Sequence, residues 1–306
     1  MKARMIVMAM AAAIMCGCEK PLYDDEVVEN VEAAGVDDNT PTKKFAFTVK
    51  GDFGSASFDE APAANRRASG YLNADGQDMT DLWVFDYMNG QCVQSVHQEQ
   101  SSAGDAWGKP TMQLAYGSHH VYFVASRGDG PTLDSDGHAI TWSTPRDAFW
   151  KDYDVNVVST SNGNRAVTLD RVATRLKIEI ADEIPAGCAQ VCVTPERWYY
   201  GWDYVNGVPV AQQQTERVVN VPEKYVGTTG EVTVSVFGLS GSSEWVTNVA
   251  ITAKNSDGAV IGSASITGTP FKANRSTEYS GSLFSSCGEL SVELGAEWES
   301  AHKGTW

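Results

Sequence analysis

The side chains that could do chemistry in this chain are histidines, cysteines, serines and carboxylates, and their spacing matches no familiar site. His119 and His120 are adjacent, so on a strand they point to opposite faces and cannot easily chelate one metal ion. Cys188 and Cys192 lack the Cys-x-x-Cys spacing of a zinc site. No serine lies in a Gly-x-Ser-x-Gly nucleophile motif with a credible histidine partner. The sequence therefore predicts no catalytic residue, no metal ligand and no cofactor.

Two further groups have ordinary structural explanations. Segments 75–78 and 134–137 contain paired aspartates, but neither matches a calcium loop, and Asp-Gly pairs are typical of turns. In an extended stretch, Cys188 and Cys192 would lie about 13 Å apart, too far for a disulfide. We interpret the cysteines beyond the N-terminus as small buried side chains whose redox state stays open: Cys92, Cys188, Cys192 and Cys287.

Aromatic side chains gather in segment 195–204, where Trp198, Tyr200 and Trp202 alternate. Sugar rings stack on aromatic faces, so these three residues are a candidate glycan platform. The alternative is that large aromatics cover the end of a β-sandwich. The sequence leaves both interpretations open.

The N-terminal segment predicts export. Lys2 and Arg4 precede an apolar run from Met5 to Met15, which is typical of a secretory signal peptide and too short to span a bilayer. Gly17 followed by Cys18 resembles the lipobox of bacterial lipoproteins. That resemblance implies cleavage after Gly17 and lipid on the Cys18 thiol, whereas the residue three before the cysteine departs from the usual leucine. A plain secreted or uncleaved chain is the alternative.

Composition limits the partners. The formal charge of −16 argues against nucleic acid, which needs clustered Lys and Arg, and against charge-driven binding to an anionic membrane. Segment 18–42 is acidic and poor in large apolar residues, so we interpret it as a tether. Its acidic residues soon after Cys18 resemble the surface-export signal of Bacteroidota lipoproteins.

From Phe45 onward the apolar residues recur with a period of two, which is typical of half-buried strands. Phe45–Val49 alternates with polar or small residues. Asn89-Gly90 between two apolar runs predicts a hairpin. Segments 112–116 and 119–125 predict a second hairpin. Thr144-Pro145, with an acidic residue in the first turn, predicts the start of a short helix.

A turn-rich break at segment 159–164 predicts a domain boundary. Beyond it, Leu176, Ile178 and Ile180 alternate with charged residues, and segments 245–253 and 259–266 predict another hairpin. Short strands, frequent turns and almost no helix predict two antiparallel sandwiches, with a closed barrel as the main alternative.

Four segments together resemble the fimbrillin and fimbrial-anchor superfamily of Bacteroidota type V pili, which includes FimB-like proteins. They occur in the order 79–87 (MTDLWVFDY), 114–125 (LAYGSHHVYFVA), 169–176 (LDRVATRL) and 273–281 (ANRSTEYSG). The resemblance implies an all-β fold of two tandem transthyretin-like Greek-key β-sandwich domains. With the lipoprotein start, it divides the chain into signal peptide 1–17, tether 18–42, N-terminal sandwich 43–162 and C-terminal sandwich 163–306.

The same resemblance implies an assembly role without enzymatic activity. Stalk subunits of the family lose an N-terminal segment to an Arg-specific protease, and the opened groove accepts a strand from the next subunit. Arg66 and Arg67 are the candidate processing site here, and cleavage there would release Phe45–Val49. An exposed Arg pair in a loop is the ordinary alternative. Tail 295–306 is short and charged, hence a poor donor strand, which favours an anchor or accessory subunit.

The sequence thus predicts an outer-membrane lipoprotein of a fimbrium, exposed at the cell surface. Its partners would be other fimbrial subunits and the membrane, with host or microbial surface ligands as adhesion targets. The competing interpretation is a surface glycan-binding lipoprotein of a nutrient-uptake system, supported by the aromatic segment alone. A sandwich hydrolase would need clustered carboxylates in a deep cleft.

Overall fold

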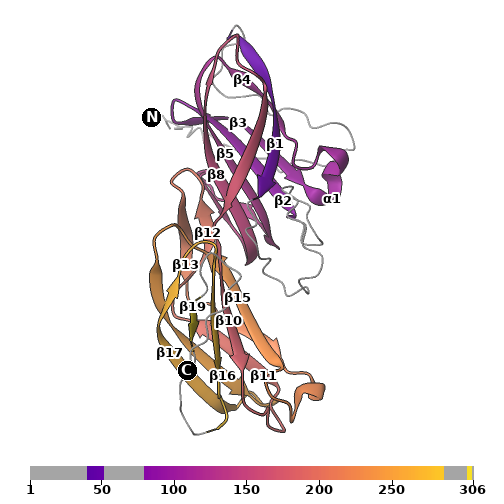
Figure 1. The fold of residues 1–306 in the computed structure, drawn as a ribbon, viewed down its shortest axis with the longest axis vertical. Helices are drawn as coiled ribbons and strands as arrows, with labels where there is room; N and C mark the ends of the chain where they lie inside the picture. The colour runs from indigo at the N-terminus through magenta and orange to yellow at the C-terminus, as the bar shows by residue number, and fades with distance from the viewer. Residues whose placement is uncertain (1–39, 52–78, 286–301, 305–306) are drawn as a thin grey trace, which may run out of the picture. The chain divides into compact units, whose positions relative to one another are not determined.

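Strands make up almost all the regular structure of this protein (Figure 1). The computed structural model describes residues 40–51, 79–285 and 302–304. Within these residues the helical turns are short: α1 (Gln100–Ala103), η2 (Gly104–Ala106) and η3 (Glu223–Tyr225). The described residues include no helix with the length and apolar character to cross a membrane. The expectation of an all-β fold is confirmed.

The first sheet has the order β3-β2-β5-β8-β9-β1-β4 and surrounds one apolar core. Its strands are β1 (Thr42–Gly51), β2 (Asp81–Met88), β3 (Gln91–Glu99), β4 (Thr111–Ala115), β5 (Gly117–Asp129), β8 (Thr144–Val157) and β9 (Asn164–Arg171). Phe47 of β1, Val84 of β2 and Phe123 of β5 belong to the same buried cluster. The sheet therefore encloses side chains from strands that are distant in sequence.

Asn89 and Gly90 make the tight turn between β2 and β3. Both have positive φ, 53° and 77°, as a type I′ hairpin turn requires. The predicted hairpin is confirmed by the antiparallel pairing of the two strands.

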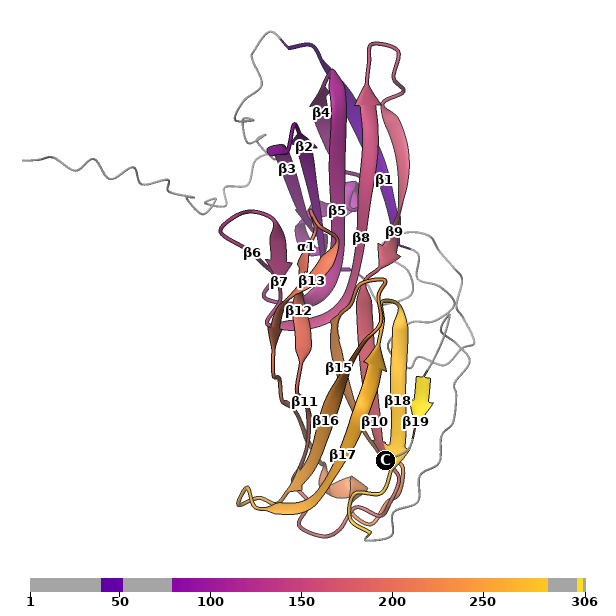
Figure 2. The same cartoon turned by 90° about the vertical axis from the view of Figure 1, so that its left-hand side faces the viewer.

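Two β-sheets face each other in the second part of the chain (Figure 2). One has the order β15-β10-β18-β19, with β15 (Val232–Leu239), β10 (Ala173–Ile180), β18 (Arg275–Gly281) and β19 (His302–Gly304). The other has the order β14-β11-β16-β17, with β14 (Arg217–Asn220), β11 (Gln190–Pro195), β16 (Trp245–Lys254) and β17 (Val260–Phe271). Leu176 and Ile178 of β10 pack with Val191 of β11 and Ile251 of β16 in one buried cluster. This cluster, between the two four-stranded sheets, is the core of a sandwich.

A small sheet combines two strands from segment 132–141 with two strands from segment 198–213. Its order is β13-β12-β7-β6, with β13 (Val208–Gln213), β12 (Trp198–Asp203), β7 (Ala139–Thr141) and β6 (Thr132–Leu133). The aromatic cluster around it includes Phe85, Trp142, Trp202 and Tyr204, and the rings of Phe85 and Tyr204 stack with centroids 4.1 Å apart. The change of sheet falls at Val172, between β9 and β10; the boundary at segment 159–164 stays a prediction.

Two local predictions are wrong. Thr144–Asp147 begins strand β8, because its backbone pairs with the end of β5, as in the Asp129↔Thr144 pair. Pro145 faces Gly128 at a register irregularity, where the missing amide of proline is tolerated. The second hairpin is also wrong, since β4 and β5 are consecutive but β4 pairs with β1. In both places a long-range strand partner overrides the local signal.

A buried ion pair connects β8 to the end of β9. Arg171 donates Nε–H to Asp147 Oδ1 at 3.1 Å and Nη2–H to Oδ2 at 3.2 Å. The Ala148 amide donates to the same carboxylate at 3.0 Å, and the guanidinium lies 5.0 Å from the Phe149 ring centroid. Burial raises the pKa of Asp147 to about 6, against the lowering effect of the Arg171 charge. The pair is therefore ionised at neutral pH but costly to desolvate.

Candidate assembly site

Strand β1 has a position in the first sheet that local sequence does not reveal. It lies between β9 and β4, parallel to β9 over Ala46↔Asn164 to Gly51↔Leu169 and antiparallel to β4 over Thr42↔Ala115 to Ala46↔Thr111. In Figure 2, β1 runs beside β9. Among the described strands of this sheet, β4 is one of the two edge strands, so β1 is its one strand partner. Removal of β1 would leave β4 and β9 with open hydrogen-bonding edges.

Main-chain hydrogen bonds hold β1 on both sides beyond the regular ladder. The amides of Phe47 and Val49 donate to the carbonyls of Pro110 and Gly108 at 3.0 and 2.9 Å. On the other side, the Ala46 amide donates to the Gly163 carbonyl at 2.7 Å. Such bonds are independent of side-chain identity, so they would serve any strand that entered this position.

Side chains of β1 alternate strictly between the core and the outside. Phe45, Phe47, Val49 and Gly51 are buried, and the intervening residues from Ala46 to Lys50 are partly exposed. Phe47 makes edge contacts with the rings of Phe123 and Tyr153, with centroids 5.2 and 6.3 Å apart. A strand in this position must therefore supply large apolar residues at alternate places.

Gly163, which faces Lys44 of β1, lies where there is no room for a side chain. A Cβ atom on Gly163 would collide with the Lys44 carbonyl oxygen, which belongs to β1. Glycine at this position lets the chain before β9 approach the backbone of β1 closely.

A buried His–Asp pair fixes the end of β4 next to β5. His119 contacts Asp86 through Nδ1 at 2.7 Å and the Ala115 carbonyl through Nε2 at 2.9 Å. Burial lowers the pKa of His119, but the hydrogen bond and charge of Asp86 outweigh it and raise the pKa above its usual value. The adjacent His120 is exposed, as expected for neighbours on a strand.

Several predicted site residues lie outside the described residues: Gly17, Cys18, Arg66, Arg67 and Cys287. Lipidation at Cys18, cleavage after Gly17 and processing at the Arg pair remain predictions. Of the described cysteines, Cys188 and Cys192 are buried as expected, whereas Cys92 is exposed, and all three are free thiols.

Two of the three rings of the candidate glycan platform, those of Trp198 and Trp202, are buried, whereas Tyr200 is partly exposed. Trp198 and Trp202 expose only 1% of their surface. Trp198 donates its Nε1–H to the Phe237 carbonyl at 2.8 Å and packs edge-on against Phe271. A sugar stacks on an exposed ring face, and these faces are occupied by protein. Trp198 and Trp202 instead pack in the protein interior, as the alternative interpretation expects for large aromatic side chains.

Sequence reasoning found β1 but missed its partners. Segment 112–116 is predicted to pair with segment 119–125, whereas β4 pairs with β1, which is distant in sequence. No periodic pattern carries that information, since antiparallel neighbours and distant partners have the same alternation.

No family model and no curated protein matches the chain. Solved structures similar to it are provisionally named adhesins and fimbrial proteins from Bacteroides and Porphyromonas. One, a provisionally named adhesin from Bacteroides ovatus, has a TM-score of 0.49 at 11% identity, over 74% of this chain and 83% of that chain.

Two particular fimbrial proteins are also similar. The fimbrial anchor protein Mfa2 from Porphyromonas gingivalis has a TM-score of 0.40 at 9% identity, over 73% of this chain and 82% of that chain. The tip fimbrial protein Mfa3 from the same organism, with a C-terminal truncation, has a TM-score of 0.36 at 12% identity, over 74% and 82%.

Proposed function

We propose that this chain is a non-enzymatic subunit of a type V fimbrium, an anchor or accessory protein that the lipid on Cys18 holds at the outer membrane. It assembles with partner subunits by β-strand addition. The four sequence segments that resemble fimbrillins support the family, and the Gly17-Cys18 junction supports the anchor.

The observation that carries the proposal is the position of β1. This N-terminal strand lies between two partners, holds three large apolar side chains in the core, and is followed in sequence by Arg66-Arg67. In an anchor that keeps its lipid, β1 would leave this position while it is still attached to the chain, whereas proteolysis after Arg67 would release it together with Cys18, as in a stalk or tip subunit. A groove with two open edges and alternate apolar pockets would remain for a donor strand.

The C-terminal tail supports an anchor or accessory role over a stalk role. β19 (His302–Gly304) pairs parallel with β18 of its own sheet. Tail 295–306 contains charged residues and lacks the long apolar alternation that a donor strand needs.

A glycan-binding role is not favoured by any observation on the described residues. Its predicted platform has two buried rings. We therefore keep assembly as the proposed function.

Intact-mass spectrometry on the protein purified from its native outer membrane tests the anchor assignment. We expect a chain that begins at an acylated Cys18. A chain that begins at Ala68 and carries no lipid would identify a processed stalk or tip subunit, and the anchor assignment would be wrong.

A further inference from the structure

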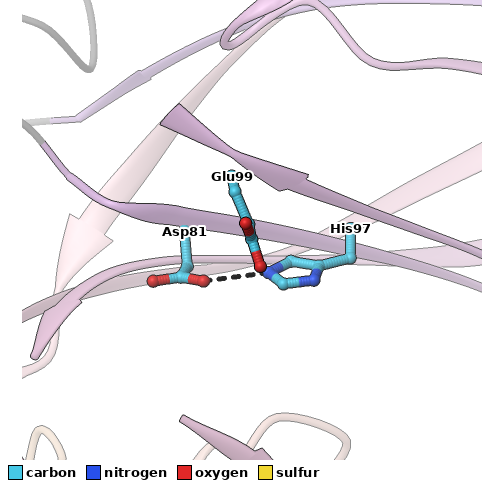
Figure 3. A group of neighbouring side chains, drawn as sticks. All are labelled: Asp81, His97 and Glu99. Carbon is cyan, nitrogen blue, oxygen red and sulfur yellow. Dashed lines mark hydrogen bonds and ion pairs between the residues drawn. The ribbon is translucent and has the colours of Figure 1, made fainter. Parts of the chain in front are cut away.

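Three side chains with metal-binding atoms meet at one end of the β2–β3 hairpin (Figure 3). Asp81 is the first residue of β2 and lies opposite Glu99, the last residue of β3. His97 lies two residues before Glu99 and opposite Trp83. Cross-strand partners and residues two apart share one face of a sheet, so the register brings all three side chains together.

The geometry of this cluster is compact. His97 Nε2 lies 2.9 Å from Asp81 Oδ1, and one ligand atom from each of Asp81, His97 and Glu99 lies within 4.8 Å of the others. Ligand atoms on one tetrahedral ion, at about 2 Å from it, are separated by about 3.3 Å. Small side-chain rotations would therefore let the three atoms share one ion.

Surrounding contacts orient two of the three ligands. The Thr80 hydroxyl donates to Asp81 Oδ2 at 2.7 Å, which leaves Oδ1 directed at His97. The His97 ring stacks on Trp83 with centroids 3.5 Å apart and planes within 10°. Outer contacts of this kind fix the orientation of metal ligands in known sites.

The charges at this position are unbalanced. Two carboxylates face one imidazole, and the chain as a whole carries a formal charge of −16. Among the described residues, no hydrogen bond or ion pair reaches the Glu99 carboxylate, although Asp81 contacts both Thr80 and His97. Two neighbouring carboxylates repel each other, and a bound cation would offset that repulsion.

We propose that Asp81, His97 and Glu99 bind a divalent transition-metal ion, with Zn²⁺ as the best fit. Imidazole and carboxylate ligands suit zinc, and three protein ligands leave a fourth position for water. Calcium and magnesium prefer six or more oxygen ligands, which this cluster does not supply. Because β3 is the edge strand and β2 its partner, the ion would cross-link the end of the edge strand to the sheet. This site is separate from the assembly strand β1, and it departs from the expectation, drawn from the sequence, that the chain has no metal ligand.

Isothermal titration of Zn²⁺ into the metal-stripped chain, with only the predicted signal peptide and Cys18 removed and Cys92 replaced by Ser, tests the proposal. We expect one site in the parent protein and a loss of affinity of about tenfold or more in His97→Gln and in Glu99→Gln. The Glu99→Gln variant is the sharper of the two, because this carboxylate has no hydrogen-bond or ion-pair partner among residues 40–51, 79–285 and 302–304, and the fold should be unaffected. The melting temperature of the parent should rise with Zn²⁺, and that of Glu99→Gln should rise less.

A second group on the same protein supplies the matched control. His120, Asp152 and Asp154 also combine one imidazole with two carboxylates, but the side chains are exposed, 56% for His120 and 77% for Asp154. His120→Gln should leave the Zn²⁺ affinity unchanged. The proposal is overturned if the parent binds no Zn²⁺, if Glu99→Gln binds it as tightly as the parent, or if His120→Gln abolishes the binding.

Discussion

Phe47→Ala is expected to lower the free energy of unfolding by about 3–5 kcal/mol, the usual cost of removing a buried phenylalanine. Phe47 exposes 1% of its surface and contacts Phe123 and Tyr153. The substitution would leave a cavity in the core beside β1, next to the rings of Phe123 and Tyr153. Urea unfolding, followed by tryptophan fluorescence, measures the change.

Thr48→Ala is the matched control on the same strand. Thr48 is only partly buried and lies on the opposite face of β1 from Phe47. Its replacement should change the free energy of unfolding by less than about 1 kcal/mol. If Thr48→Ala costs as much as Phe47→Ala, the register of β1 against the core is wrong.

Arg171→Met is expected to lower the free energy of unfolding by at most about 3–5 kcal/mol at neutral pH, because it removes the guanidinium that is hydrogen-bonded to the buried Asp147 carboxylate and leaves Arg127 as the remaining nearby positive charge. The methionine retains much of the apolar volume over Phe149. Asp147→Asn combined with Arg171→Met should recover part of the loss, since the amide oxygen can still accept from the Ala148 amide. The three proteins are compared by urea unfolding.

The pH dependence of the Arg171→Met effect follows from the pKa of Asp147. Burial raises that pKa to about 6 from 3.8, so the folded state binds the proton more tightly than the unfolded state does. The stability contributed by this group is present in full below the unfolded value and is lost as the pH rises through about 6. Without Arg171 the pKa of the carboxyl rises further. There is then a pH range in which the Asp147 carboxyl is protonated in the folded variant but ionised in the folded parent. The loss in the free energy of unfolding caused by Arg171→Met therefore becomes smaller as the pH falls.

Unfolding at pH 7.5 and at pH 5.5 checks this dependence. The free-energy difference between the parent and Arg171→Met should be smaller at the lower pH. An equal difference at both pH values would mean that Asp147 does not titrate in this range.

Local patterns predicted the strands well because alternation and turn chemistry are properties of neighbouring residues. Asn89-Gly90 has the two positive φ angles that its hairpin needs, and β16 pairs with β17 as expected. Thr144-Pro145 resembled a helix start because a cap and a proline are local signals too. Its strand state depends on β5, whose pairing no local signal encodes.

The candidate sites differ in how far their geometry depends on strand pairing that local sequence does not reveal. The apolar alternation of Phe45–Val49 was visible in the sequence, but its place between β9 and β4 was not. His97 and Glu99, two residues apart on a strand, indicate a shared face, but the register that adds Asp81 depends on an irregularity between Asp86 and Tyr87. A register count outward from the Asn89-Gly90 turn would place Asp81 opposite Gln98 and would miss the cluster. Burial of Trp198 and Trp202 could not be predicted, since aromatic composition is the same for an exposed platform and for a core.

Strand exchange in the folded protein tests the central claim most directly. The chain is cleaved after Arg67 under native conditions and incubated with an excess of isotope-labelled peptide spanning residues 41–52, and native mass spectrometry then measures which peptide is bound. We expect the labelled peptide to replace the severed segment. A matched peptide with serine in place of Phe45, Phe47 and Val49 should not enter, because it lacks the side chains that fill the core. Retention of the severed segment against the excess, or equal incorporation of both peptides, would contradict assembly by replacement of β1.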